Sequence, residues 1–292
     1  MKHKKNILLR AYPPSCLRPF ALFTLFSLLL FSLSPFLLFS QPSPIVILHT
    51  NDTHSHIEPL NDKHEGNDVG GVLRRNTFIQ ETRREYPNTL LVDAGDFSQG
   101  TPYFNLLKGV PEIELMNQMG YDVVVLGNHE FDNGSKALAK RLKIADFKVL
   151  CANYQFKNKQ LAKIVKPYTI IHIAGKKIGF FGLLRDLKKV VLPDVYKETT
   201  FLDPIAAAQK MVDLLKNQEQ CDLIICLSHL GIDPEYSEDI SDSMVAEQVQ
   251  GIDFIIGGHN HKLLKEPVIV NNTKILQVKQ NGIYVGRIVI SD

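Results

Sequence analysis

The sequence predicts an α/β fold with mixed sheets, because β-branched runs alternate with amphipathic segments from Ile45 onward. Two hairpin patterns among the strands indicate that the sheets are mixed rather than purely parallel. The strand candidates are IVILH (45–49), TLLVDA (89–94), DVVVLG (122–127), KVLCAN (148–153), DLIICLSH (222–229) and DFIIGGH (253–259). Helical patterns fall between them, at residues 72–85, 111–119, 135–145, 204–217 and 242–249.

Local residues set the ends of several of these elements. The first helix is expected to end before Pro87, and the helix at 204–217 opens with Asp203 as a cap and Pro204 at its first position. The segment YTIIHIAGKKIGFFGLL predicts a hairpin that turns at Ala174-Gly175. The segment PVIVNNTKILQVKQNGIYVGRIVI predicts an antiparallel meander at the end of the sequence.

Length and composition favour one domain from about residue 42 to residue 292. The chain has 292 residues, 45% of them apolar, and no stretch has the composition of a linker. Cys151, Cys221 and Cys226 form no CxxC pair. We therefore expect buried thiols that pack as small apolar side chains, rather than a disulfide or a zinc site.

The first 40 residues have the composition of an export signal. Five basic residues and no acidic residue accompany a long apolar run that ends at the small residue Ser40. An uncleaved membrane anchor at residues 19–40 is the alternative, because the apolar run is long for a signal. We expect an exported protein, periplasmic or extracellular. Without residues 1–40, 28 of the 33 Lys and Arg remain against all 31 Asp and Glu, which gives no reason to expect a nucleic-acid polymer as partner.

Polar side chains follow five of the predicted strands, at the point where each strand ends. The turns read HTNDTHSH, GDFSQG, GNHEFD, SHLG and GGHNH. Because α/β folds place their sites beyond the carboxyl ends of strands, we expect these turns to meet. The candidate residues in them are Asp52, His54, Asp96, Asn128, His229, His259 and His261.

The type and number of these residues predict two metal ions. Asp52 and His54 are two residues apart, which would place both side chains on one side of an extended chain. Carboxylate, imidazole and amide oxygen suit Mn²⁺, Zn²⁺ or iron, whereas Mg²⁺ favours oxygen ligands. Seven ligands are too many for one zinc ion and fit two ions that share a carboxylate. A single histidine after a strand is usually a capping or solvated residue, but five such turns in order are hard to obtain by chance.

The sequence resembles the calcineurin-like metallophosphoesterase superfamily in four motifs: ILHTNDTHSH, DAGDFSQGTP, MGYDVVVLGNHEFDNG and GIYVGRI. Within the superfamily it is similar to the secreted 5'-nucleotidase family, which includes UDP-sugar hydrolases and 2',3'-cyclic phosphodiesterases. The likeness extends over residues 45–292. It implies a four-layer α/β/β/α sandwich with a metallophosphoesterase catalytic domain at residues 42–292. It also implies hydrolysis of phosphate esters, with nucleotides as expected substrates, through a metal-bridging hydroxide.

The resemblance also implies a role for each candidate residue. The implied ligands are Asp52, His54 and His261 for one ion, Asn128, His229 and His259 for the other, and Asp96 as the bridge. His129 and Asp132 match the family's catalytic pair: His129 would donate to the phosphoryl or leaving oxygen, and Asp132 would orient the imidazole. Their spacing of three residues places both on one face of a helical turn. Two divalent ions are implied, as Mn²⁺, Zn²⁺, iron or Mg²⁺.

The sequence departs from the family at its end. Family members continue past YVGRI into a second domain that resembles a clamp for the base and the phosphate, whereas this sequence ends at Asp292. We expect either a separate polypeptide to supply that domain or a broad-specificity phosphomonoesterase or phosphodiesterase, with activity on 2',3'-cyclic nucleotides included. A non-catalytic binding subunit of a two-chain nucleotidase and a sulfur-ester hydrolase are further alternatives. The intact His129 and Asp132 argue against the non-catalytic subunit.

Three other residues near these turns have simpler explanations. His49 lies inside a strand, so we expect it in the core or directly behind the ligands. His56 has the same parity as His54 and would compete with it as a ligand. Arg74 opens a helix, where a solvated helix face is the simpler interpretation than a phosphate contact.

Overall fold

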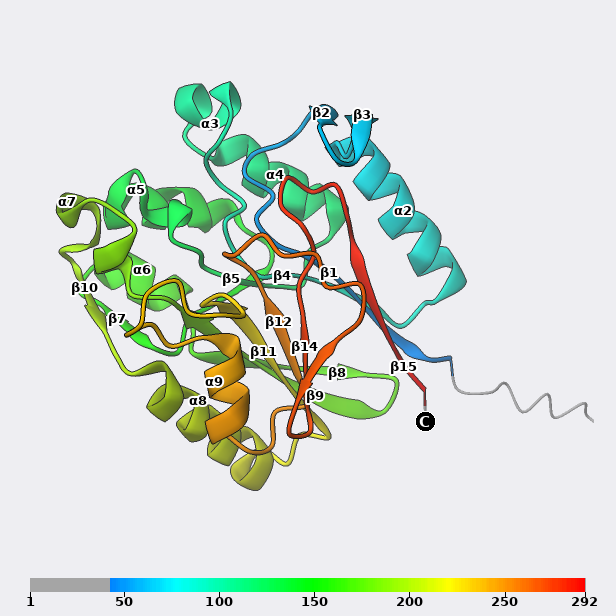
Figure 1. Cartoon of the computed structure of the whole chain (residues 1–292), viewed down its shortest axis with the longest axis vertical. Coiled ribbons are helices and arrows are strands. Elements are labelled where there is room, and N and C mark those ends of the chain that lie inside the picture. The colour runs from blue at the N-terminus through cyan, green and yellow to red at the C-terminus, as the bar shows by residue number, and fades with distance from the viewer. Residues whose placement is uncertain (1–42, 292) are drawn as a thin grey trace, which may run out of the picture. The chain divides into compact units, whose positions relative to one another are not determined.

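The computed structural model describes residues 43–291, in which most strands belong to two β-sheets (Figure 1). In spatial order, the strands of the first sheet are β15 (Gly286–Ile290), β1 (Ile45–Thr50), β4 (Thr89–Asp93), β5 (Val123–Val125) and β6 (Lys148–Leu150). Those of the second sheet are β13 (Val268–Val270), β14 (Thr273–Leu276), β12 (Phe254–Gly257), β11 (Leu223–His229), β9 (Lys176–Leu184) and β8 (Tyr168–Ile173). The edge strands β15, β13 and β8 run antiparallel to their neighbours, and the other pairings are parallel. The prediction of two mixed sheets is confirmed.

Helices cover the outer face of each sheet. Figure 1 shows α2, α4 and α5 on one side of the strands and α8 and α9 on the other. The helices in the described part of the chain are α2 (Val72–Glu85), α3 (Pro102–Leu107), α4 (Val110–Met119), α5 (Gly134–Arg141), α6 (Lys159–Ile164), α7 (Pro193–Tyr196), α8 (Pro204–Asp213) and α9 (Asp242–Gln248).

Alternate side chains along a strand enter different apolar layers, because successive residues point to opposite faces of a sheet. In β1, Val46 and Leu48 belong to the cluster between the first sheet and its helices, while Ile45 and Ile47 belong to the cluster between the two sheets. Phe181 of β9 belongs to a third cluster, which lies between the second sheet and the helices α8 and α9. These three apolar layers define the expected four-layer α/β/β/α sandwich.

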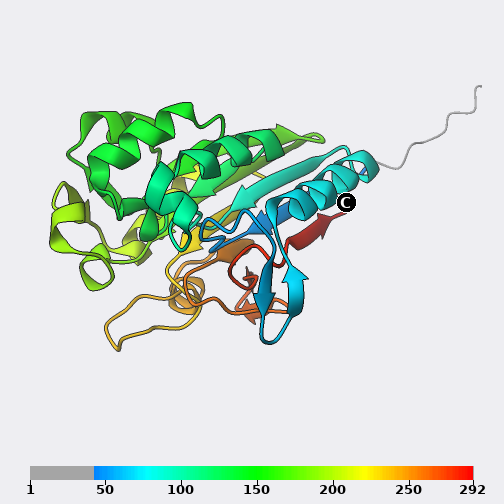
Figure 2. The same ribbon diagram turned by 90° about the horizontal axis from the view of Figure 1, so that it is seen from above.

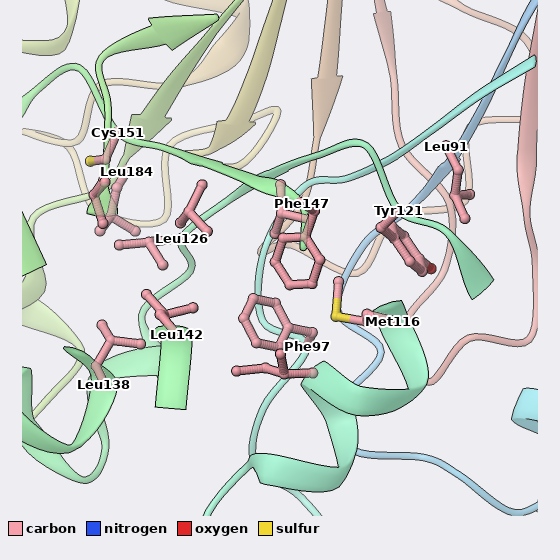
Figure 3. Packing of buried hydrophobic residues seen from close by; sticks show 14 of the residues in the cluster. Leu91, Phe97, Met116, Tyr121, Leu126, Leu138, Leu142, Phe147, Cys151 and Leu184 are labelled. Atoms are coloured by element: carbon pink, nitrogen blue, oxygen red, sulfur yellow. The ribbon is translucent and has the colours of Figure 1, made fainter. Parts of the chain in front are cut away.

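The first cluster also anchors one of the polar turns. Phe97 follows Asp96 directly and is fully buried. Figure 3 shows its ring beside Phe147 and Met116 in the packed interior. Burying a Phe side chain contributes about 2 kcal/mol, so this packing holds the turn that carries Asp96 in place.

Local signals gave most element boundaries correctly. The helix α2 spans the expected residues, and the β8–β9 hairpin turns at Ala174-Gly175 as predicted. Asp203 caps α8 by accepting a hydrogen bond from Ala206 N at 2.6 Å. The predicted helices at 135–145 and 204–217 are completed by a 3₁₀ turn at Leu142–Ile144 and a π turn at Leu214–Gln218. The predicted strands at 122–127, 148–153 and 253–259 were too long, because their last residues turn into loops.

The expected meander at the end of the sequence is wrong in its third strand. β13 and β14 form the antiparallel pair, but β15 crosses to the other sheet and pairs with β1, placing Ile288 opposite Ile47. There it covers the edge of β1, which would otherwise expose unpaired backbone groups. The place left beside β14 is taken by β12, in parallel.

Several short elements were not predicted. They are the hairpin of β2 (Leu60–Asp62) and β3 (Gly66–Val69), the pair β7 (Tyr154–Phe156) and β10 (Thr199–Phe201), and the helices α3, α6 and α7. Figure 2 shows the β2–β3 hairpin projecting from the layered body. Lys279 ties the hairpin to the segment before β15 through ion pairs with Asp62 and Glu65, both at 3.2 Å.

The proposed export signal at residues 1–40 and the alternative anchor at residues 19–40 lie outside the described residues. Among residues 43–291, no helix is long and apolar enough to cross a membrane.

Candidate metal centre

The polar turns that follow β1, β4, β5, β11 and β12 meet at one place, although they come from two sheets. Within the first sheet, Asp52 N donates to Gly95 O at 2.8 Å and His54 N donates to Asp96 O at 3.0 Å. Between the sheets, His259 N donates to the Asp52 carboxylate at 2.9 Å. The predicted convergence of these turns is confirmed.

Five of the seven candidate ligands have a left-handed backbone, which non-glycine residues rarely adopt. The φ angles are +49° at Asp52, +45° at His54, +55° at Asp96, +75° at His259 and +56° at His261. Backbone strain of this kind concentrates at functional sites, where the surrounding structure holds it. The expectation of an extended chain at 52–54 was therefore wrong. Left-handed turns, rather than strand alternation, bring Asp52 and His54 together.

The first group of potential ligand atoms consists of Asp52, His54 and His261. His261 Nε2 lies 3.3 Å from Asp52 Oδ1 and 3.1 Å from His54 Nε2. Asp52 is completely buried, whereas the His261 side chain is 39% exposed. The group is thus open to solvent on the side of His261.

The second group consists of Asp96, His229 and His259. His229 Nε2 lies 3.0 Å from Asp96 Oδ2. The rings of His229 and His259 pack edge to face, with 5.3 Å between their centroids. Asp52 Oδ1 of the first group is 3.9 Å from His229 Nε2, so the two groups adjoin each other. The division of Asp52 and the four histidines between the two groups is the one that the family resemblance implies, whereas Asp96, the implied bridge, lies in the second group alone.

Asn128 lies next to the second group through its neighbours in the chain. His129 N donates to Asp96 Oδ1 at 2.9 Å, and a Cβ atom at Gly127 would come within 2.1 Å of that same oxygen. Only glycine therefore permits this approach of the two turns. Asn128 Oδ1 is buried without a hydrogen-bond partner among the described residues, whereas the equally buried His229 Nε2 lies against the Asp96 carboxylate. Buried polar atoms are rarely left unpaired, so Asn128 Oδ1 is available to an ion.

Charges in the centre are strongly coupled. Burial would raise the pKa of Asp96, but His229, His129 and His54 hold it well below its usual range. Burial would lower the pKa of His229, but Asp96 and Asp52 raise it to about 10. In the ion-free protein a proton on His229 thus offsets the buried carboxylates, and a metal ion would compete with that proton.

His129 and Asp132 form the contact that their spacing predicts. His129 Nδ1 donates to Asp132 Oδ2 at 2.9 Å across one 3₁₀ turn, and neither residue belongs to the two ligand groups. Burial would lower the pKa of His129, but the hydrogen bond to Asp132 and the charge of Asp96 raise it to about 8. The imidazole is therefore an acid near neutral pH. Its ring lies 5.4 Å from that of His54, so it faces the first ligand group.

Glu130 is a residue that the sequence analysis missed. Its fully buried carboxylate accepts hydrogen bonds from Asp96 N at 3.0 Å, Gly127 N at 2.7 Å and Ser98 N at 3.0 Å. It thereby joins the turn that carries Asp96 to the turn that carries Asn128. The only signal in the sequence was an acidic residue in the middle of GNHEF, a turn where a solvated side chain is the ordinary expectation.

The other flagged residues have structural roles. His49 is buried against the backbone of β15 at Gly286, and burial lowers its pKa to about 4. His56 is in neither ligand group. The exposed Arg74 side chain pairs with Asp68 at 2.6 Å, as expected of a solvated helix face. The three cysteines in residues 43–291 are free, and Cys151 and Cys226 are buried.

Comparison with known proteins identifies the class to which this fold and site belong. The sequence model of the calcineurin-like phosphoesterase family matches residues 45–263, a range that contains every candidate ligand and both residues of the His129–Asp132 pair. The chain belongs to the calcineurin-like phosphoesterase family. That family consists of metal-dependent phosphoesterases.

Individual relatives are 5'-nucleotidases and related phosphoesterases. A 5'-nucleotidase of Rattus norvegicus is 35% identical over 229 residues, covering 75% of this chain and 38% of the relative. The crystal structure of a 5'-nucleotidase precursor from Thermus thermophilus has a TM-score of 0.77 at 34% identity, covering 85% of this chain and 51% of that chain. The calcineurin-like phosphoesterase YfkN from Bacillus subtilis has a TM-score of 0.69 at 27% identity, covering 85% of this chain and 84% of that chain. The chain thus spans less than half the length of the rat relative.

Proposed function

We propose that this chain hydrolyses phosphate esters at a centre of two divalent metal ions and that nucleotides are its substrates. The observation that carries the proposal is the meeting of two ligand groups from two sheets, Asp52 with His54 and His261, and Asp96 with His229 and His259. The buried atom Asn128 Oδ1, which has no hydrogen-bond partner among the described residues, supports it, because an ion would satisfy this oxygen. Imidazole, carboxylate and amide oxygen together fit Mn²⁺, Zn²⁺ or iron better than Ca²⁺.

Two ions bound here would lower the pKa of coordinated water and neutralise phosphoryl oxygens. The chain itself supplies proton transfer and positioning. Because Asp132 accepts at Nδ1 of His129, the ring's Nε2–H is left to donate to the phosphoryl or leaving oxygen. Asp132 keeps the ring in that tautomer and favours its protonated form. Asp96, which accepts from His129 N at one oxygen and lies against His229 at the other, would help to hold both ions.

Nucleotides are proposed as substrates because the relatives from Rattus norvegicus and Thermus thermophilus are named 5'-nucleotidases. The test uses the purified chain, stripped with a chelator and reloaded with Mn²⁺, Zn²⁺ or Mg²⁺. Phosphate release is measured from AMP, UMP, 2',3'-cyclic AMP, a sugar phosphate and an aryl phosphate. Asp96→Asn prepared in parallel controls for contaminating phosphatases.

The expected result is metal-dependent release from nucleotides that the Asp96→Asn preparation lacks. Activity on the aryl phosphate with no preference for nucleotides over sugar phosphates would make the chain a broad-specificity phosphoesterase and overturn the nucleotide assignment. No turnover of any ester by the metal-loaded chain would overturn the proposed reaction and favour a binding function.

We also propose that residues 1–40 direct export and that the catalytic domain is residues 42–292. The basic head and the apolar run that follows it support this proposal. N-terminal sequencing of the protein secreted by an expression host tests it. Cleavage near Ser40 is expected, whereas retention of Met1 on a membrane-bound chain would support the anchor.

A further inference from the structure

The two buried histidines of the proposed centre, His229 and His54, each have one ring nitrogen at the ligand group and the other against an oxygen. His229 Nδ1 donates to Ala94 O at 2.7 Å, which leaves Nε2 beside Asp96. His54 Nδ1 faces Ser98 O at 3.4 Å, which leaves Nε2 beside His261. In both cases the oxygen that fixes the ring is a backbone carbonyl, part of the turn after β4.

His259 differs in the kind of oxygen that faces it. Its Nε2 lies 3.2 Å from Glu235 Oε2, a side-chain carboxylate on the segment between β11 and α9. A carboxylate can only accept, so Nε2 carries the hydrogen and Nδ1 is the nitrogen left for an ion. In His229 and His54, by contrast, Nδ1 faces the fixing oxygen and Nε2 is the nitrogen left for an ion.

Glu235 is itself held by a buried cation. Arg185 follows β9, is only 4% exposed, and donates from Nη1 to Glu235 Oε2 at 2.6 Å. Its Nη2 donates to Asp239 Oδ2 at 3.1 Å, and that carboxylate also accepts from Tyr236 N at 3.0 Å. The arginine therefore ties both ends of the segment 235–239 to the end of β9. Glu235 Oε2 lies between the guanidinium and the imidazole, which limits its freedom to turn away.

We propose that Glu235, anchored by Arg185, is a positioning residue that fixes the orientation and tautomer of His259 for the ion of the second group. The inference rests on the proposed two-metal centre and adds a residue outside the seven ligands. Carboxylates that accept from a ligating histidine orient the ring and raise its basicity, and their removal typically lowers metal affinity by about 10- to 100-fold. Because His259 belongs to one ligand group only, the loss of affinity should affect one of the two ions.

The experiment measures metal binding directly, separately from turnover. Wild type, Glu235→Ala, Glu235→Gln and Glu238→Ala are titrated with Co²⁺ against a chelator of known affinity, with bound metal counted and the visible absorption of Co²⁺ recorded. Glu238 is the matched control, because it lies on the same segment and pairs with Lys189 at 3.3 Å without contacting His259. Glu235→Gln keeps a carbonyl oxygen that can accept from Nε2. Thermal unfolding of each ion-free variant checks that it is folded.

Wild type and Glu238→Ala should bind two ions alike. Glu235→Ala should bind one ion normally and the other about 10- to 100-fold more weakly, with an altered Co²⁺ spectrum, and Glu235→Gln should recover most of that affinity. Suppose that wild type binds two ions. If Glu235→Ala then binds both with wild-type affinity, or loses the same affinity for both, the inference is overturned and the proposed function still stands. A wild type that binds no ion would overturn the proposed function itself.

Discussion

The buried carboxylate of Glu130 should contribute to stability through the two turns that it joins. In Glu130→Gln only one of the two terminal atoms can accept, so the amide oxygen can keep Asp96 N and Gly127 N while Ser98 N loses its acceptor. A buried donor left unpaired costs about 1–3 kcal/mol. For a domain of this size, each kcal/mol lowers Tm by about 2–4 °C, so a decrease of roughly 2–12 °C is expected.

The assay is thermal unfolding of the ion-free protein at pH 5. Burial raises the pKa of Glu130 to about 7, so at pH 5 the wild-type side chain is neutral, as Gln is, and the lost acceptor for Ser98 N is not offset by the removal of a buried charge. Glu112→Gln is the matched control, because Glu112 is also buried but neither of its oxygens has a hydrogen-bond partner among the described residues. Its Tm should stay at or above that of wild type. An unchanged Tm in Glu130→Gln, or an equal loss in Glu112→Gln, would refute the role given to these hydrogen bonds.

Three further outcomes follow from the centre. Asp96→Asn should weaken the binding of both ions, whereas Asp52→Asn should weaken the binding of one. Metal analysis that finds two tightly bound ions in Asp96→Asn would contradict the role of Asp96 as a ligand shared by both ions. His129→Ala should keep both ions and lose about 10²–10⁴ in kcat. Asp132→Asn should lose less of its kcat. The decrease in its rate on the alkaline side should begin at lower pH than in wild type, because the carboxylate that helps to raise the pKa of His129 to about 8 is gone. If His129→Ala binds one ion fewer than wild type, His129 is a metal ligand rather than an acid. Burial raises the pKa of Asp93 from 3.8 to about 8, so ion-free wild type loses stability as pH rises through that range. The Tm of Asp93→Asn relative to wild type should therefore be higher at pH 9 than at pH 5, and a flat or opposite trend contradicts this.

Elements with strong local signals could be predicted from the sequence. The helix α2 has a helical apolar pattern and a proline just beyond its end, and the β8–β9 hairpin has a glycine turn between alternating strands. The path of β15 could not be predicted, because an alternating strand fits either sheet equally well. Only the unpaired edge of β1, a tertiary feature, determines its place.

The residues proposed as ligands could be found because imidazole and carboxylate side chains are unusual directly after buried strands. Their geometry could not be found, since positive φ at Asp52, His54 and His261 depends on contacts between turns that are distant in sequence. The roles of Glu130 and Glu235 could not be predicted from the sequence for a related reason. Each lies in a polar loop, where an acidic residue is ordinarily solvated, and its partners come from other turns.

The most direct test of the two-metal hydrolase is a stoichiometric titration. Metal-free protein is titrated with Mn²⁺ while bound metal and the rate of phosphate release from a phosphate ester are measured together. Two bound ions per chain, with full activity reached only at the second equivalent, are expected. Full activity at one equivalent, or turnover that persists in the metal-free protein, would contradict the proposed centre.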